Sequence, residues 1–230
     1  MKKNYYHIFS LLMLWTFVLF GENALAQVSS YAFNQSSGTY TAITGGTVFG
    51  TITSDDQRFV DPATPAGGTV NTGVGIPIGF SFTHNGIVFD RLAINNNGWI
   101  SLGQSSLTPS VDINTTNAYT PLSSTATNTP TLLRNRIAGI GRDLQGQTGS
   151  EIRVETIGTA PNRICVVQWT NYKRYSTTGT GDILNFQIRL FETSNYVQVM
   201  YGACTFGANP STATHVGLGG TVVTDYNNRT

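Results

Sequence analysis

The chain has 230 residues with 13 basic and 12 acidic side chains, which gives a formal net charge of +1. Beyond residue 3 the only lysine is Lys173, and the arginines are spread singly, so the sequence lacks the basic stripe of a nucleic-acid-binding protein. The length suits one domain of about 200 residues, a common size for a β-sandwich, better than two.

An export signal is predicted at the amino terminus. Two lysines at positions 2–3 precede an apolar run over Ile8–Phe20, and Ala24-Leu25-Ala26 forms a small-x-small peptidase site before Gln27. The apolar run is shorter than the about 20 residues that span a membrane, and no cysteine follows it to carry a lipid. We therefore expect cleavage between Ala26 and Gln27. The product would be secreted or held at the cell surface, or periplasmic if no sorting domain follows, without a membrane anchor.

Two segments rich in small polar residues and proline are expected to be loops. Ser54–Asn71 contains Asp55, Asp56 and Asp61, and Gln104–Thr131 has few large apolar residues. Connections of this length are uncommon in compact domains. Each is predicted to be a surface loop, either at the rim of a binding surface or as flexible decoration.

Between these segments, Ile76–Gly103 predicts three consecutive antiparallel strands. Asn-Gly pairs separate short runs of apolar and β-branched residues, and glycine adopts the positive φ that tight hairpins need. A two-residue Asn85-Gly86 turn would place Phe82 opposite Phe89 on one face of the sheet.

The second Asn-Gly pair does not fit a two-residue turn. Such a turn at Asn97-Gly98 would set Ile94 against Ser101 and so cross an apolar face with a polar one. A longer or bulged loop is predicted instead, with Trp99 beginning the next strand.

Further period-two runs follow. In the run after Asn185, Phe186, Ile188 and Leu190 should face the core, with Gln187 and Arg189 on the opposite face. By the same parity, Val197, Val199 and Tyr201 should also face inward. Together the patterns predict an all-β fold, an antiparallel β-sandwich of two packed sheets with long surface loops; the later runs are Ile152–Ile157, Ile164–Trp169, Ile183–Phe191, Tyr196–Tyr201 and His215–Leu218.

The two cysteines, Cys165 and Cys204, form a candidate disulfide, because an even pair in an exported chain meets an oxidising environment. The alternative is two thiols that serve as small apolar residues. By the strand alternation, the side chain of Cys204 should point away from the core. This favours the second interpretation unless the strand ends or bulges near Gly202.

No catalytic or metal-binding constellation is predicted, and no cofactor. His84 and His215 are not spaced as zinc ligands. The acids considered for glycoside hydrolysis are Asp143, Glu151, Glu155 and Glu192. On one strand Glu151 and Glu155 would lie about 13 Å apart, too far for a carboxylate pair, so they are interpreted as solvent-facing charges. Asp55, Asp56 and Asp61 could offer oxygens to calcium, but lack the EF-hand spacing.

The string Pro-Ile-Gly-Phe-x-Phe, then Asn-Gly, then Asn-x-x-Gly-Trp-Ile-Ser-Leu-Gly within Ile76–Gly103 resembles the nidogen-like extracellular β-domain. Later runs agree, namely Pro161–Trp169, Asn185–Glu192, Tyr196–Gly202 and His215–Leu218. The chain is still more similar to the N-terminal β-domain of large secreted Bacteroidetes proteins, on Tyr31–Gly46, Gly158–Arg163 and Asp225–Thr230. The resemblance covers most of Tyr31–Thr230.

The chain departs from this family in two ways. Nidogen-like domains have an Ala-Pro-x-Trp-x-Asp run, whereas Ala138–Leu144 lacks the tryptophan and retains only Asp143 of the acids. The relatives also continue into further strands, repeat domains and a sorting domain for type IX secretion. The resemblance therefore implies that residues 27–230 form a single β-sandwich domain, truncated at its C-terminal end.

Three functions remain open. The first is a non-catalytic extracellular module for adhesion or interaction, with an unidentified protein or glycan as partner. The second is a carbohydrate-binding module in which exposed aromatic side chains stack on sugars, with Tyr119, Tyr172 and Tyr175 as candidates. The third is an accessory domain of a larger secreted enzyme. Fold resemblance alone names no ligand.

Overall fold

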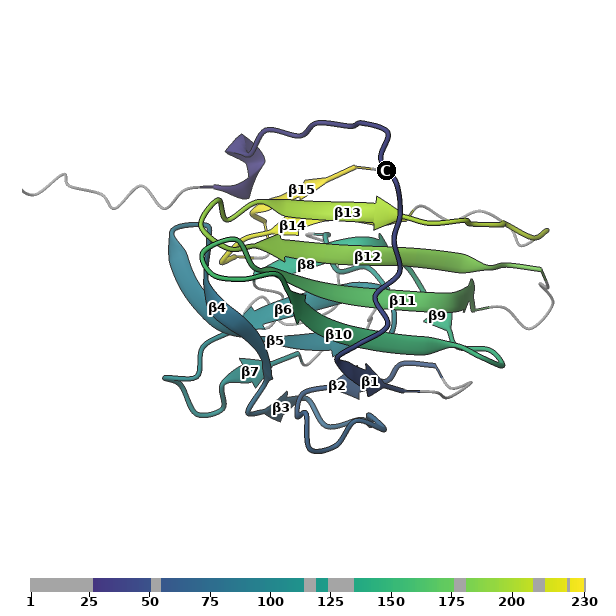
Figure 1. The fold of residues 1–230 in the computed structure, drawn as a ribbon, viewed down its shortest axis with the longest axis horizontal. Coiled ribbons are helices and arrows are strands. Elements are labelled where there is room, and N and C mark those ends of the chain that lie inside the picture. Colours follow the sequence, from purple (N-terminus) through teal and green to yellow (C-terminus); the bar gives the residue numbers. More distant parts are fainter. Residues whose placement is uncertain are drawn as a thin grey trace, which may run out of the picture.

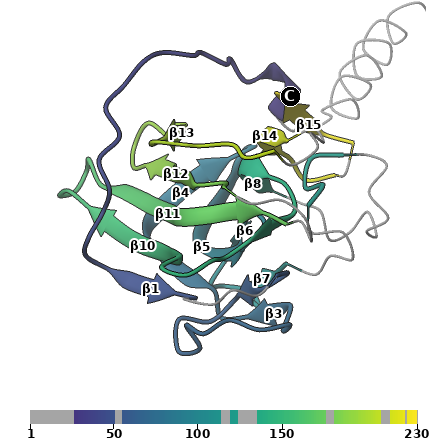
Figure 2. The same ribbon diagram turned by 90° about the vertical axis from the view of Figure 1, so that its right-hand side faces the viewer.

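The computed structural model describes residues 27–50, 55–113, 119–123, 135–175, 181–208, 214–222 and 224–229. They form two antiparallel sheets packed face to face, with a small two-stranded sheet at one edge (Figures 1 and 2). The predicted all-β antiparallel sandwich is confirmed. One short 3-10 helix, η1 (Val28–Ser30), precedes the strands.

The first sheet has the strand order β1-β10-β11-β12-β13, and β9 also pairs with β11. Its strands are β1 (Thr47–Phe49), β9 (Leu144–Gln145), β10 (Glu151–Ile157), β11 (Ile164–Arg174), β12 (Leu184–Phe191) and β13 (Val197–Tyr201).

The second sheet has the order β15-β14-β8-β6-β5-β2, and β4 also pairs with β5. Its strands are β2 (Arg58–Phe59), β4 (Ile76–His84), β5 (Ile87–Asn95), β6 (Trp99–Gly103), β8 (Arg136–Gly141), β14 (His215–Gly219) and β15 (Tyr226–Asn228). The small sheet pairs β3 (Thr72–Gly73) with β7 (Val111–Asp112).

The β4–β5 hairpin matches its sequence prediction. Asn85 and Gly86 both have positive φ, 51° and 75°, as a tight two-residue turn requires. His84 pairs with Ile87, and the register then places Phe82 opposite Phe89, both buried in the core.

The β5–β6 connection is a three-residue loop, so the longer connection is also confirmed. Asn95 pairs with Trp99 and Ile94 with Ile100, which keeps the apolar faces together. Gly98 closes the loop with φ 82°, and a Cβ there would lie 2.0 Å from the carbonyl oxygen of Ile140. Only glycine fits this close approach to β8.

The main core lies between the two sheets. Phe186, Ile188 and Leu190 of β12 are fully buried, as the alternation predicts, and Trp169 stacks on Phe186 with ring centroids 4.8 Å apart. Tyr201 of β13 reaches across the sandwich and donates a hydrogen bond to a carbonyl of β8. Because each buried side chain of this size contributes about 1.5–3 kcal/mol, this layer supplies most of the stability.

The outer face of the first sheet is covered by residues 38–46, which we call the N-terminal strap (Figure 2). Gln187 Nε2 donates to the carbonyl of Thr41 at 2.9 Å, and Gln168 Oε1 accepts from the amide of Ile43 at 2.9 Å. Gln187 does face away from the core, as predicted. However, the strap buries it, so this face is not open to solvent.

A second, smaller core lies on the outer face of the second sheet. Trp99 of β6 is fully buried there, and Val111 and Leu122 belong to the same apolar cluster. The Arg136 guanidinium lies 4.1 Å from the centroid of the Trp99 ring, and burial lowers its pKa to about 9. The prediction of a plain surface loop over 104–131 is therefore wrong for these residues, because their apolar side chains cover the tryptophan.

Candidate functional site

Three carboxylates distant in sequence meet at one end of the sandwich. Oxygens of Asp55, Asp56 and Asp143, which we call the acidic cluster, lie within 4.8 Å of one another. Burial and the neighbouring charges of Asp55 and Asp56 raise the pKa of Asp143 to about 7. Burial, with the charge of Asp56, also raises the pKa of Asp55. Like charges this close favour retention of a proton within the group.

Asn97 of the β5–β6 loop organises this cluster. Its Nδ2 donates to Asp56 Oδ1 at 2.8 Å, while its Oδ1 accepts from the amide of Leu144 at 2.7 Å. An isolated antiparallel β-bridge between Asp55 and Gln145 also ties the cluster to β9. The family-like Asn-x-x-Gly loop and the Asp143 segment are thus tied together by one buried amide.

The acidic cluster is the group of side chains that could hold a divalent cation in the described part of the chain. The sequence grouped Asp55 and Asp56 with Asp61 for this purpose. In the structure Asp61 instead accepts a hydrogen bond from the amide of Ala63 at 2.8 Å. Sequence reasoning missed the contribution of Asp143, although its place in the family-like run was the available signal.

The other acids considered for catalysis have structural contacts. Glu151 forms an ion pair with Arg153 at 2.9 Å, and Glu192 Oε2 accepts from Arg163 Nε at 2.8 Å. Glu155 accepts from the amide of Gly45 in the N-terminal strap at 3.2 Å. Glu151 and Glu155 are partly exposed and lie on the face of β10 opposite its buried residues, where both have structural partners.

Both described histidines serve the fold. His84 is almost fully buried, with Nε2 3.0 Å from the carbonyl oxygen of Gly219, and burial lowers its pKa. His215 Nδ1 accepts from the amide of Leu122 at 3.1 Å, and burial also lowers its pKa. Each ring links separate segments of the second sheet and its loops.

Cys165 and Cys204 are free thiols, so the candidate disulfide is not formed in this structure. Through the pairing of β11, β12 and β13, Cys165 is level with Val197. Cys204 comes after Tyr201, which is itself four residues past Val197 along β13. Four strand residues span about 13 Å, well beyond the about 7 Å between Cα atoms that a disulfide tolerates. Burial raises the pKa of Cys165 to about 12.

The aromatic candidates for sugar stacking divide into two kinds. Tyr172 is buried in the main core, so it is not available for contact with a ligand. Tyr119 and Tyr175 are exposed. The amide of Tyr175 donates to the carbonyl of Asp143 at 2.8 Å, which places this aromatic residue beside the acidic cluster.

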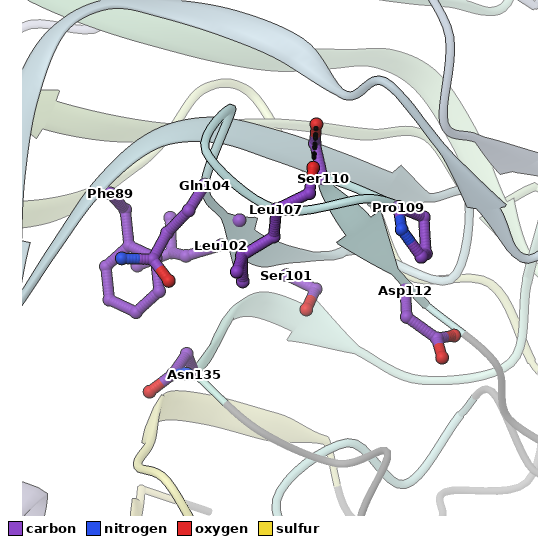
Figure 3. A pocket seen from close by; sticks show the side chains of 10 residues that line it. Phe89, Ser101, Leu102, Gln104, Leu107, Pro109, Ser110, Asp112 and Asn135 are labelled. Carbon is purple, nitrogen blue, oxygen red and sulfur yellow. Dashed lines mark hydrogen bonds between the residues drawn. The ribbon is translucent and has the colours of Figure 1, made fainter.

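A cavity of about 300 Å³ opens on the second sheet beside the end of β6 (Figure 3). Phe89, Leu102 and Leu107 provide apolar wall, and Gln104, Ser110, Asp112 and Asn135 are among the polar residues that line it. The Oδ1 atom of Asn135 is buried without a hydrogen-bond partner. The lining is thus mixed in character, with polar groups about as prominent as apolar ones.

The leader is not tested by the structure. Residues 1–26, with Ala26 of the predicted cleavage site, lie outside the described residues, which begin at Gln27. Among the described residues, no helix is long and apolar enough to cross a membrane.

Comparison with known proteins supplies the family. No curated protein and no solved structure matches the chain. A family model described as NIDO related matches residues 30–230 and so takes in every strand of both sheets. Nidogen-related domains are a non-enzymatic domain type, and nidogen-like domains are typically extracellular. The chain belongs to the nidogen-related family.

Proposed function

We propose that this domain is a non-catalytic extracellular binding module of a secreted or cell-surface bacterial protein, which acts by contact with a protein or glycan. Family membership supports the module type. The predicted signal peptide, cleaved after Ala26, supports export of a single domain over residues 27–230. The resemblance to the N-terminal β-domain of type IX secretion proteins supports a Bacteroidetes origin.

The cavity beside β6 and its apolar rim carry this proposal. Leu107, which lines the cavity, is 54% exposed, and Val88, next to the lining residue Phe89, is 51% exposed. Gln104 Nε2 donates to the carbonyl of Val88 at 2.8 Å and so ties the loop to the end of β5. Apolar surface beside a preformed hollow is typical of a place that a partner covers.

The proposal is tested by binding of labelled protein to the surface of producing cells and to extracellular matrix from their habitat. Leu107→Asp should raise the Kd at least about tenfold, which corresponds to about 1.4 kcal/mol. The control is Tyr196→Asp, because Tyr196 is similarly exposed, at 51%, in the first sheet's β12–β13 turn. Equal binding by both variants would contradict the proposal, and a hydrolytic activity lost with one carboxylate would contradict its non-catalytic part.

Carbohydrate binding is the second candidate, and the chemistry of the same cavity favours it. The exposed Leu107 provides an apolar wall, while Gln104, Asp112 and Asn135 offer amide and carboxylate groups to hydroxyls. A glycan array should then show binding that Asp112→Asn weakens. Absence of any signal at high protein concentration would count strongly against this candidate.

A further inference from the structure

The first sheet ends in a strand whose outer backbone groups have no partner among the described residues. β13 (Val197–Tyr201) pairs on one side with β12. Hydrogen bonds from Gly202 to Asn185 and from Phe191 to Tyr196 set the register, so alternate residues of β13 point their backbone groups toward β12. The amides and carbonyls of Val197, Val199 and Tyr201 therefore point outward.

Other sheet edges carry features that discourage pairing. β4 contains Pro77 and a register shift before Phe82, while β1 and β15 have only three residues each. β13 has five residues, Val-Gln-Val-Met-Tyr, without a charge, a proline or a glycine. Short edge strands, prolines and bulges are the usual protections against strand addition, and β13 lacks them all.

The side chains of β13 fit the same conclusion. Val197 and Val199 are only half-buried although they face the core, and Tyr201 is 46% exposed. Gln198 and Met200 lie on the other face. The incomplete burial arises because no further strand continues the inner layer past β13, so an added strand with apolar residues at alternate positions would complete it.

We propose that β13 is a self-association edge, which pairs antiparallel with β13 of a second copy around a twofold axis at Val199. In this register Val199 pairs with its equivalent, and Val197 of each copy pairs with Tyr201 of the other. The three outward amides and three outward carbonyls of each copy then all find partners. Apolar residues meet on the inner face, and Gln198 meets Met200 on the outer face.

This complete match favours a second copy over a foreign strand, since the edge is complementary to itself. The uncharged strand also brings no like charges together at the axis. The segment 32–37, which precedes the N-terminal strap and passes over this side of the sandwich (Figure 1), is exposed and makes no backbone hydrogen bond among the described residues. It is therefore the segment that shifts when two edges approach.

Sedimentation velocity over a range of protein concentrations tests this pairing. Val199→Pro removes one outward amide but no hydrogen bond to β12, and proline is accepted at such edge positions. The matched control, Val199→Ala, trims the side chain but keeps the amide. Wild type and Val199→Ala should form dimers as concentration rises, whereas Val199→Pro should remain monomeric.

Amide hydrogen exchange of the wild-type peptide 196–202 gives a second readout that needs no variant. Exchange at Val197, Val199 and Tyr201 should slow as concentration rises, while the amides already bonded to β12 change little. A wild-type protein that is monomeric at every concentration would overturn the proposal. So would dimers that persist in a folded Val199→Pro variant, or concentration-independent exchange at the three outward amides.

Discussion

Replacement of Asp143 by Asn should make the domain more stable at alkaline pH and remove part of its pH dependence. In the folded chain burial and the charges of Asp55 and Asp56 raise the pKa of this carboxyl from 3.8 to about 7. The folded state therefore holds a proton that the unfolded state releases between about pH 4 and pH 7. Stability is fully present below that window and is lost as pH rises through it.

The size of the effect follows from the pKa. A fully shielded carboxyl with this change would contribute about 4 kcal/mol across the window. Because Asp143 is partly exposed to water, which screens its neighbours, we expect about 1–2 kcal/mol. For a domain of this length that is a rise in Tm of about 3–6 °C at pH 8 for Asp143→Asn, with little change at pH 4.

Thermal melts by circular dichroism between pH 4 and pH 8 test this, with a chelator present so that no divalent cation neutralises the acidic cluster. Asp61→Asn is the matched control, because it removes an acid of the Ser54–Asn71 segment, which also carries Asp55 and Asp56, but one that lies outside the cluster. Parallel Tm curves for wild type and Asp143→Asn across the whole range would refute the reasoning.

Three further outcomes are expected. Gly98→Ala should lower the free energy of unfolding by more than about 2 kcal/mol in denaturant titrations. The control Gly86→Ala should cost about 1 kcal/mol, because Gly86 has a similar positive φ but open space where a Cβ would lie. Equal losses would show that the contact with β8 is unimportant. Gln187→Leu should remove the donor to the Thr41 carbonyl of the N-terminal strap and to the buried Gln168 Oε1, at a cost of about 1–3 kcal/mol, and speed proteolysis of residues 38–46. An unchanged proteolysis rate would show that Gln187 does not hold the strap. In the native protein iodoacetamide should label the partly exposed Cys204 but not Cys165, whose pKa burial raises to about 12; mass spectrometry showing neither thiol free would instead indicate a disulfide.

Local chemistry in the sequence was enough to predict the central strands. The Asn85-Gly86 turn fixes its own register because both residues accept positive φ, and the mismatch between Ile94 and Ser101 excludes a two-residue turn at the second pair. The strands of two or three residues, such as β1 and β7, were not predicted. They are too short to show a period, and long-range pairing alone defines them.

The candidate sites depend on contacts that sequence spacing does not reveal. Asp56 and Asp143 are far apart in the chain, and their oxygens meet where Asn97 binds both Asp56 and the amide of Leu144, next to Asp143. The N-terminal strap shows no alternation, because it is held by backbone hydrogen bonds to the side chains of Gln168 and Gln187 and not by a strand ladder. The cavity likewise arises from the loop after β6 folding back over Phe89.

The most direct test of the binding function is a footprint of the bound surface. Hydrogen exchange of the protein, measured free and after capture on the cells or matrix that it binds, should show protection in residues 101–112, which include the cavity lining from Ser101 to Asp112. The peptide 184–191 from the centre of the first sheet should be unchanged. Protection confined to surfaces away from 101–112, or no protection at saturation, would contradict binding through the cavity beside β6.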